Sequence, residues 1–138
     1  MHLVNNMVDH GIEYPYEREA IQKPQEGRIE LVITIEKTTM VLEFHDDGRG
    51  INPREIERVA REKGLIPEDR SLQNSELFDL LFLDGFTTRK EASTVSGRGV
   101  GLAAIQAEVA KLGGTIEVRS RLGKGSSFEI TVPLAAKA

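Results

Sequence analysis

Hydrophobic and polar residues alternate along two pairs of neighbouring segments in this chain. In the first pair, residues 29–35 and 40–44 alternate on either side of the short connection Lys37–Thr38. In the second pair, residues 115–121 and 126–134 alternate around a turn rich in glycine. Alternation with a period of two is typical of a β-strand that buries one face. The sequence therefore predicts two β-hairpins.

Helical periodicity is found in three other segments. Residues 1–13 place apolar side chains on one stripe and polar side chains on the other, which predicts an amphipathic helix. A second helix is predicted over residues 53–63, because it begins with a proline and is followed by a glycine. A third is predicted over residues 102–112, where a pair of glycines stops the apolar stripe.

The remaining segments complete a prediction of the fold class. A short helix is expected from Ser75, as its N-terminal cap, to Leu83. Residues 14–27 and 84–96 are predicted to be loops. The order helix, hairpin, helices, hairpin indicates an α+β protein. We expect a two-layer α/β sandwich with helices on one face of a mixed, mostly antiparallel sheet.

Composition excludes several other classes of protein. A length of 138 residues predicts one domain, residues 1–138, and a net charge of -4 argues against a broad surface for nucleic acid. The absence of cysteine excludes disulfides and thiolate metal sites. No apolar run approaches the roughly 20 residues that span a bilayer, and no signal-peptide pattern is present. We therefore predict a cytoplasmic chain without direct membrane insertion.

Three glycines at alternate positions, Gly97, Gly99 and Gly101, come directly before the third predicted helix. The first turn of a helix has N–H groups without intrahelical partners and the positive end of the helix dipole, so it suits phosphate. Glycine lets such a ligand approach closely, and Arg98 could add a charged donor. A loop that leads into a tightly packed helix explains the pattern equally well.

A second glycine cluster, DDGRGI, follows the strand predicted over residues 40–44. Asp46 at the end of this strand could accept a hydrogen bond from an amine such as that of adenine, while the glycines let a flat ring lie against the backbone. An ordinary Asp-Gly turn is the alternative. Asp47 and Arg49 are interpreted as solvated turn residues.

Asn6 lies on the polar stripe of the first predicted helix, between His2 and His10. Magnesium prefers oxygen ligands and is usually held by one or two protein oxygens together with substrate phosphates, so the Asn6 amide is a plausible ligand. A zinc site built on the two histidines lacks a third ligand at suitable spacing. An ordinary exposed helix face remains the alternative.

The combination and order of these motifs resemble the GHKL ATPase superfamily, and within it the ATP-binding catalytic domain of chemotaxis-type histidine kinases. HLVNNMVDHGIE is similar to the N box, DDGRGIN to the first glycine box and LLFLDGFTT to the F box. SGRGVGL and GKGSSFEITVPL are similar to the second and third glycine boxes. The five motifs extend over residues 2–134. The resemblance implies the Bergerat ATP-binding fold.

The resemblance also implies roles for individual residues. Asn6 matches the asparagine that coordinates magnesium between the ATP phosphates, and Asp46 matches the aspartate that binds the adenine amine. Gly48 and Gly50 would shape the adenine wall, and Phe86 would anchor the ATP lid. The complete set of expected nucleotide-binding residues is Asn6, Asp9, His10, Asp46, Gly48, Gly50, Ile51, Phe86, Thr87, Thr88, Ser96, Gly97, Arg98, Gly99, Val100, Gly101 and Leu102.

His2 separates the kinases of this superfamily from its hydrolases. Members that hydrolyse ATP, such as gyrase and the mismatch-repair proteins, have a water-activating glutamate at this place. A histidine there is similar to the chemotaxis-type kinases and could act as a base or hydrogen-bond partner for an attacking imidazole. The expected catalytic residues are therefore His2 and Asn6. The implied reaction transfers the γ-phosphoryl group of Mg-ATP to a histidine on a separate phosphotransfer or dimerisation domain, with a response regulator as an indirect partner.

Two other functions stay open at this point: a GHKL-type ATP hydrolase, and a catalytically inactive ATP-binding or interaction module. The resemblance also allows the chain to be part of a larger, membrane-associated receptor kinase. Related domains have a helix and a strand before the N box, so we expect a fold that lacks its first strand and helix. An open sheet edge would then be available to a second copy of the chain, which predicts a homodimer.

Overall fold

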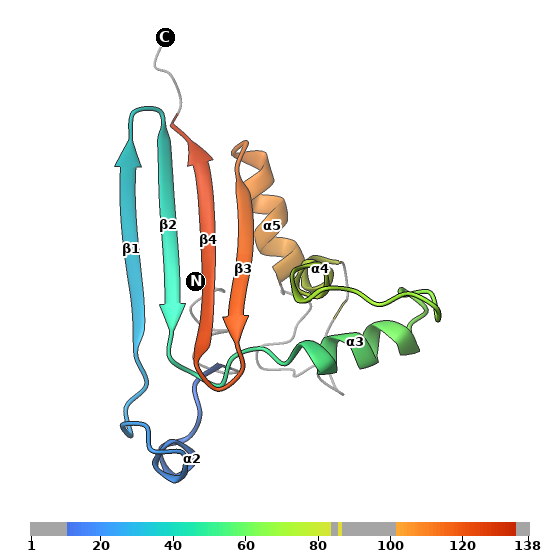
Figure 1. Ribbon diagram of the computed structural model, residues 1–138. Coiled ribbons are helices and arrows are strands. Elements are labelled where there is room, and N and C mark those ends of the chain that lie inside the picture. The colour runs from blue at the N-terminus through green and yellow to red at the C-terminus, as the bar shows by residue number, and fades with distance from the viewer. Residues whose placement is uncertain (1–10, 84–85, 87–101, 135–138) are drawn as a thin grey trace.

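The computed structural model describes residues 11–83, 86 and 102–134. In these residues, four strands form one sheet in the order β1-β2-β4-β3, and all neighbouring pairs are antiparallel (Figure 1). The strands are β1 (Ile29–Glu36), β2 (Thr39–Asp46), β3 (Thr115–Arg121) and β4 (Gly125–Pro133). Both predicted hairpins are confirmed, and β2 and β4 join them into one sheet.

The helices described are α2 (Pro15–Ala20), α3 (Pro53–Glu62), α4 (Asn74–Asp79), the short 3-10 helix η2 (Leu80–Phe82) and α5 (Leu102–Lys111). Helix α3 follows Asn52, whose side chain accepts a hydrogen bond of 3.0 Å from the Arg54 N–H. It is followed by Gly64, which has a φ of +74°, a conformation that glycine adopts at little cost. The helices predicted over residues 53–63 and 102–112 are thus confirmed. Within the described residues, no helix is long and apolar enough to cross a membrane.

Helix α2 corrects the prediction that residues 14–27 form a loop. Pro15 occupies the first helical position, and the Glu17 carboxylate accepts a hydrogen bond of 2.9 Å from the Tyr14 N–H. These two features are helix-start signals, but a helix of six residues is too short to show apolar periodicity.

The predicted start of the short helix at Ser75 is also corrected. Helix α4 begins at Asn74 and is preceded by Gln73, so Ser75 is not its cap. The Gln73 N–H instead donates to the Glu76 carboxylate, at 2.9 Å. Of the helix predicted over residues 1–13, residues 1–10 lie outside the described part, and Ile12 and Glu13 are not helical.

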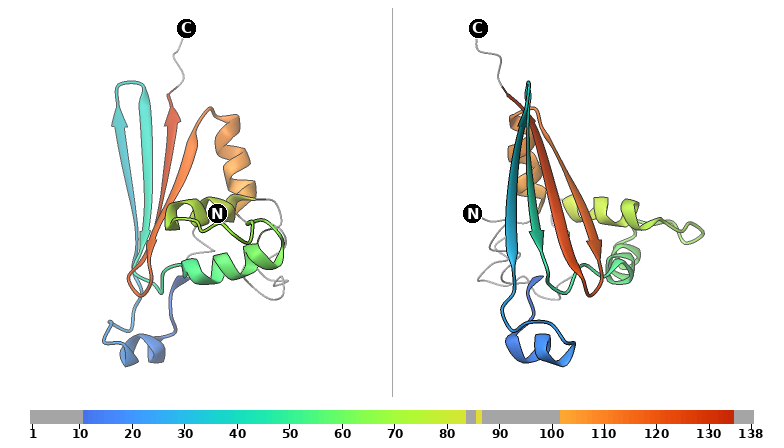
Figure 2. Two further views of the ribbon diagram at one scale, coloured as in Figure 1. Left: turned by 45° about the vertical axis from the view of Figure 1, so that its right-hand side comes forward. Right: turned by 60° about the vertical axis from the view of Figure 1, so that its left-hand side comes forward.

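The core lies on one face of the sheet. Alternation along the strands brings Phe44, Phe128 and Ile116 together with Phe82 of η2, and α5 packs against this cluster. A second cluster joins α3 and α4. Its buried members are Ile56, Ala60, Ile66, Leu77 and Phe78. The views in Figures 1 and 2 agree that α3, α4 and α5 gather beside β3 and β4, which confirms the expected α+β class.

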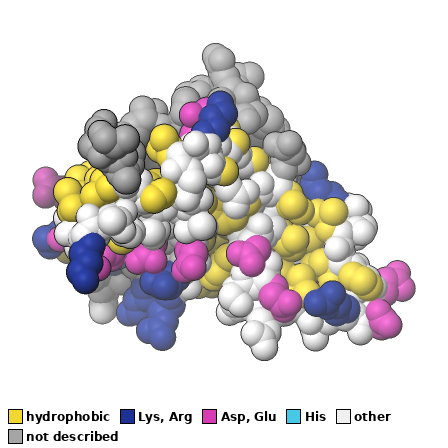
Figure 3. Space-filling view, turned by 90° about the horizontal axis from the view of Figure 1, so that it is seen from above, with side chains coloured by type: hydrophobic (Ala, Val, Ile, Leu, Met, Phe, Trp, Pro, Cys, Tyr) yellow, Lys and Arg dark blue, Asp and Glu magenta, His cyan; other side chains and the backbone are white. Residues whose placement is uncertain are grey.

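The edge strand β1 has an apolar face without a helix over it in the described part of the chain. Leu31 and Ile33 pair with Phe44 and Leu42, so they lie on the same face as the core. Yet Leu31, Ile33 and Ile35 are 48%, 54% and 64% exposed. Figure 3 shows exposed hydrophobic side chains at the left, where Figure 1 has β1.

Candidate functional site

Asp46 is the last residue of β2, and its side chain is on the core side of the sheet. It alternates with His45 and follows the buried Phe44 by two residues, so it faces the same way as Phe44. Only 9% of Asp46 is exposed. Its Oδ1 accepts a hydrogen bond of 2.8 Å from the Gly48 N–H, which fixes one carboxylate oxygen against the turn that follows the strand.

The two glycines after Asp46 are required by close contacts with other parts of the backbone. A Cβ at Gly48 would collide with the Gly11 carbonyl, and a Cβ at Gly50 would collide with the Arg121 carbonyl. Gly50 also has a φ of +76°, which side-chain-bearing residues rarely adopt. The turn therefore presents bare backbone next to a buried carboxylate.

Burial raises the pKa of the Asp46 carboxyl above its ordinary value of 3.8. The backbone N–H groups of Gly48 and Ser126 act in the opposite direction, and the nearby carboxylates of Asp47 and Glu13 add to the increase. Asp46 is therefore a carboxylate with little access to water. A hydrogen-bond donor on a ligand could replace the hydration that this carboxylate loses on burial.

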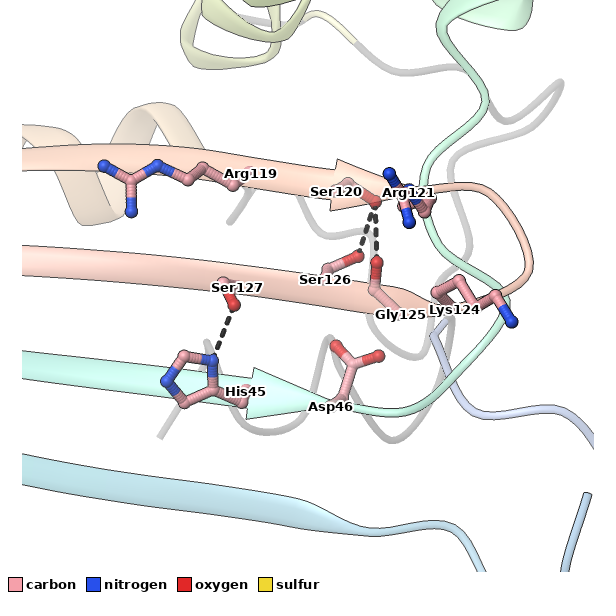
Figure 4. Close-up of a pocket in the computed structure, with 9 residues that line it drawn as sticks. All are labelled: His45, Asp46, Arg119, Ser120, Arg121, Lys124, Gly125, Ser126 and Ser127. Atoms are coloured by element: carbon pink, nitrogen blue, oxygen red, sulfur yellow. Dashed lines mark hydrogen bonds between the residues drawn. The ribbon is translucent and has the colours of Figure 1, made fainter.

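A shallow pocket of about 340 Å³, with Asp46 in its lining, lies at the ends of β2, β3 and β4 (Figure 4). It is lined by His45, Asp46, Arg119, Ser120, Arg121, Lys124, Gly125, Ser126 and Ser127. His45 Nδ1 and Ser127 Oγ lie 2.6 Å apart, and both residues alternate with buried phenylalanines, so they face away from the core. We therefore place the candidate site at the core-facing carboxylate of Asp46 rather than on the side of the pocket formed by His45 and Ser127.

A family model described as histidine kinase-, DNA gyrase B-, and HSP90-like ATPase matches residues 1–136. The chain belongs to this family. The GHKL membership expected from the five motifs is thus confirmed.

Two curated relatives of this GHKL domain are similar over nearly its whole length. The chemotaxis protein CheA of Treponema pallidum is 41% identical over 134 residues, which are 97% of this chain and 16% of that protein. The gliding motility regulatory protein of Myxococcus xanthus is 39% identical over 135 residues, which are 96% of this chain and 17% of that protein. The GHKL domain described here therefore spans less than a fifth of the length of either relative.

A solved structure shares the fold of the GHKL domain. The mycobacterial sensor histidine kinase MprB matches with a TM-score of 0.54 and 23% identity, over 96% of this chain and 68% of that one. At this identity the likeness concerns the fold alone, and it supports the α+β sandwich.

The described part of the GHKL domain contains six of the residues predicted to bind nucleotide. These are Asp46, Gly48, Gly50, Ile51, Phe86 and Leu102. Ile51 and Phe86 pack against the cluster of α3 and α4, whereas Leu102 packs against the cluster that contains Phe44. Leu102 is thereby brought to the same face of the sheet as Asp46.

The other predicted site residues lie outside the described residues of the domain. They are His2, Asn6, Asp9, His10, Thr87, Thr88, Ser96, Gly97, Arg98, Gly99, Val100 and Gly101. Their roles stay predictions. In the described ranges, no group of three histidine or acidic side chains could hold a metal ion, so the magnesium assignment depends on Asn6.

Sequence reasoning missed an ionic cluster beside the Asp46 turn. The interpretation of Asp47 as a solvated turn residue is only partly right: its side chain is 42% exposed, but its Oδ2 accepts a hydrogen bond of 2.9 Å from Arg18 Nη2 and its Oδ1 accepts one of 2.8 Å from the Arg28 N–H. Burial alone would raise the pKa of the Asp47 carboxyl, but these hydrogen bonds hold it below its ordinary value. The partners of Asp47 lie 19 and 29 residues away, so no local pattern indicated them. The side chain of Arg49 is exposed to a similar extent, 46%, but its contacts are longer, 3.6 Å to Glu17 Oε1 and 3.4 Å to the Ile12 carbonyl.

Proposed function

We propose that this GHKL domain binds Mg-ATP and transfers the γ-phosphoryl group to a histidine on a separate phosphotransfer domain in two-component signalling. The buried carboxylate of Asp46, at a turn that only glycines permit, carries the proposal. A desolvated acceptor next to bare backbone suits both the amine and the flat face of adenine. The similarity to a relative named sensor histidine kinase CheAY, which is 38% identical over 136 residues, favours a kinase over a hydrolase.

The proposal assigns the remaining chemistry to residues outside the described part. Asn6 would hold magnesium, which when bound neutralises charge on the phosphates. The backbone N–H groups around Gly97 and Gly99 would bind phosphate oxygens. His2 would accept a proton from, or hydrogen-bond to, the attacking imidazole.

The proposed partners are the acceptor histidine domain, a response regulator reached through it, and a second copy of the chain. The exposed side chains of Leu31, Ile33 and Ile35 on the edge strand β1 support the homodimer. Placement in the cytoplasm stays a prediction from the sequence.

Calorimetric titration of ADP and of a non-hydrolysable ATP analogue, with magnesium, tests the nucleotide site. Replacing Asp46 by asparagine should weaken ADP binding about tenfold or more, since a hydrogen bond to a charged group contributes about 1.5–3 kcal/mol. Asp79→Asn, an exposed aspartate on α4, is the matched control and should bind as the unaltered chain does. Asn6→Ala should weaken binding only when magnesium is present.

A second assay separates kinase, hydrolase and inactive module. Transfer of labelled phosphoryl from ATP to a purified histidine-containing phosphotransfer domain should require that domain and should fall in His2→Ala. Release of inorganic phosphate at an equal rate without the acceptor would indicate a hydrolase. An unaltered chain that binds neither ADP nor the analogue would instead support the inactive interaction module.

A further inference from the structure

Arg18 is a charged residue that the structure buries completely. Its side chain on α2 has 0% exposure, and its guanidinium donates four hydrogen bonds. Nε donates to the Pro24 carbonyl at 2.6 Å, and Nη1 donates to Glu13 Oε1 at 2.8 Å. Nη1 also donates to the Asp47 carbonyl at 3.3 Å, and Nη2 donates to Asp47 Oδ2 at 2.9 Å.

Lys23 contacts the same turn, and its ammonium group donates three hydrogen bonds. Nζ donates to Glu13 Oε2 at 2.7 Å, to the Asp47 carbonyl at 2.9 Å and to the Gly48 carbonyl at 2.8 Å. Its side chain keeps 17% exposure. The three N–H groups of an ammonium are therefore all directed at the ionic cluster and at main-chain carbonyls of the turn.

Residues 11–28, which include Arg18 and Lys23, form further hydrogen bonds with the turn that follows Asp46. The Arg49 N–H donates to the Gly11 carbonyl at 2.7 Å, and the Arg28 N–H donates to Asp47 Oδ1 at 2.8 Å. On the inner side of the same turn, the Gly48 N–H donates to Asp46 Oδ1. The Asp46 carboxylate is thus oriented by the N–H of the Asp47–Gly48 peptide unit. Residues 11–28 bond the main chain on both sides of that N–H.

Stability alone is a weak reason for this arrangement. Replacing a buried ion pair by well-packed apolar residues is often neutral or stabilising. Apolar side chains, however, cannot bind the Asp47 and Gly48 carbonyls in defined directions. The cluster has two cations, Arg18 and Lys23, against two carboxylates, Glu13 and Asp47, so it fixes these carbonyls without leaving a net charge beside Asp46.

We propose that Arg18 and Lys23 are positioning residues that hold the Asp46–Gly48 turn in the conformation in which the Asp46 carboxylate selects a purine carrying an exocyclic amine. The inference rests on the proposed function, because it concerns how the same nucleotide site recognises its base. Releasing the turn lowers the fraction of chains in which the Asp46 carboxylate is placed to accept the amine, and the apparent affinity for an amine-carrying purine falls by that fraction. A turn that is competent in about a tenth of the molecules would bind ADP about tenfold more weakly.

Base discrimination tests this role, because a merely structural role would not change it. ADP and inosine diphosphate, which has a carbonyl where adenine has the amine, are titrated into the unaltered chain, Lys23→Met and Lys23→Arg. Lys23→Met keeps the aliphatic stem but should lose about tenfold in ADP affinity and little in inosine diphosphate affinity. Lys23→Arg should recover part of the discrimination. Equal weakening of both nucleotides, or no change in either, would overturn the proposal.

Two additional variants make the comparison robust. Lys111→Met removes an ammonium group that is bonded to Glu108 on the surface of α5 and should leave the ratio of affinities unchanged. Arg18→Lys keeps the charge but loses the planar fork, so it should reduce discrimination further than Lys23→Arg does. If Arg18→Lys does not fold, the lysine variants still decide the question.

Hydrogen exchange without nucleotide separates failure of this inference from failure of the proposed function. In Lys23→Met, the Gly48 and Arg49 amides should exchange faster relative to the Phe44 amide in β2. A uniform change, or none, would show that Lys23 does not hold the turn. An unaltered chain that binds no ADP would overturn the proposed function, while the exchange ratios would still decide whether the cluster fixes the turn.

Discussion

The two ends of strand β1 contrast in an instructive way. At the end near Asp46, the charged side chains of Arg18 and Glu13 are buried. Toward the other end, Ile33 and Ile35 are mostly exposed. Burial of a charge is the informative observation, because charged residues are almost never buried without partners, whereas exposed apolar residues are common. We call the end of β1 near Asp46 the ionic end and the end with Ile33 and Ile35 the apolar end. The contrast indicates that the buried charges of the ionic end fix a defined geometry, and that the side chains of the apolar end are available for contact.

The largest expected effect comes from removing the buried arginine of the ionic end. Arg18→Met leaves two carboxylates, Glu13 and Asp47, with Lys23 as the one remaining cation of the cluster, and should lower the free energy of unfolding by about 3–5 kcal/mol. Urea denaturation measures the change as a shift of the midpoint. Arg70→Met, whose ion pair is exposed, should change it by less than about 0.5 kcal/mol.

A double variant sharpens this result. Adding Glu13→Leu to Arg18→Met removes the uncompensated charge and should recover much of the lost stability. If the double variant is as unstable as the single one, packing of the arginine stem rather than charge is the cause.

The second prediction compares two isoleucines. Ile56 on α3 is fully buried, so Ile56→Ala should cost about 2–5 kcal/mol. Ile35 on β1 is 64% exposed, so Ile35→Ala should cost less than about 0.5 kcal/mol. Urea midpoints measure both. Similar losses would mean that the apolar end of β1 is covered in solution.

The sequence predicted the regular elements well because their side-chain periods are local. Alternation located both hairpins, and Pro53 with Gly64 located α3 within a residue. The glycine cluster after β2 drew attention to Asp46, which the structure buries, while its role in binding stays a prediction. These signals need only a short window of the chain.

The ionic cluster could not be predicted in the same way. A charged residue such as Arg18 looks like a solvated position unless its acceptors are known, and Asp47 lies 29 residues further along the chain. The exposure of the apolar side chains of β1 could not be predicted either. Alternation predicts which side chains share a face of the sheet, but not how far the helices extend across that face. Both features depend on tertiary packing.

The third prediction uses the opposite pKa changes of two carboxyls at the ionic end. Burial raises the Asp46 pKa above 3.8, so the folded state binds a proton more readily than the unfolded state, and stability falls as the pH rises through that window. Asp46→Asn keeps an oxygen for the Gly48 N–H and should therefore be more stable than the unaltered chain at pH 7, with a smaller gain at pH 4. Urea denaturation at both pH values measures this. A loss of stability at pH 7 would contradict it.

Glu13 should behave in the opposite sense. Burial acts to raise its pKa, but the hydrogen bond from Lys23 and the charges of Lys23 and Arg18 outweigh burial and lower it below 4.5. Its stabilising contribution is therefore complete above that value and is lost as the pH falls through the folded-state pKa. Glu13→Gln should remove this acid dependence. An unchanged acid dependence in Glu13→Gln would show that other carboxyls cause it.

The smallest expected effect on folding tests the apolar end. Ile33→Lys places a charge on the exposed apolar face of β1 and should change the free energy of unfolding by less than about 0.5 kcal/mol. If two copies associate through this edge, the same change should convert dimers to monomers in light scattering coupled to size exclusion, because a charge would then be buried at the contact. Thr34→Lys is the matched control, since neighbouring residues of a strand point to opposite faces. An unaltered chain that is monomeric, or a dimer that both variants leave intact, would overturn the dimer at β1, and the contrast between the two ends would then reduce to packing alone.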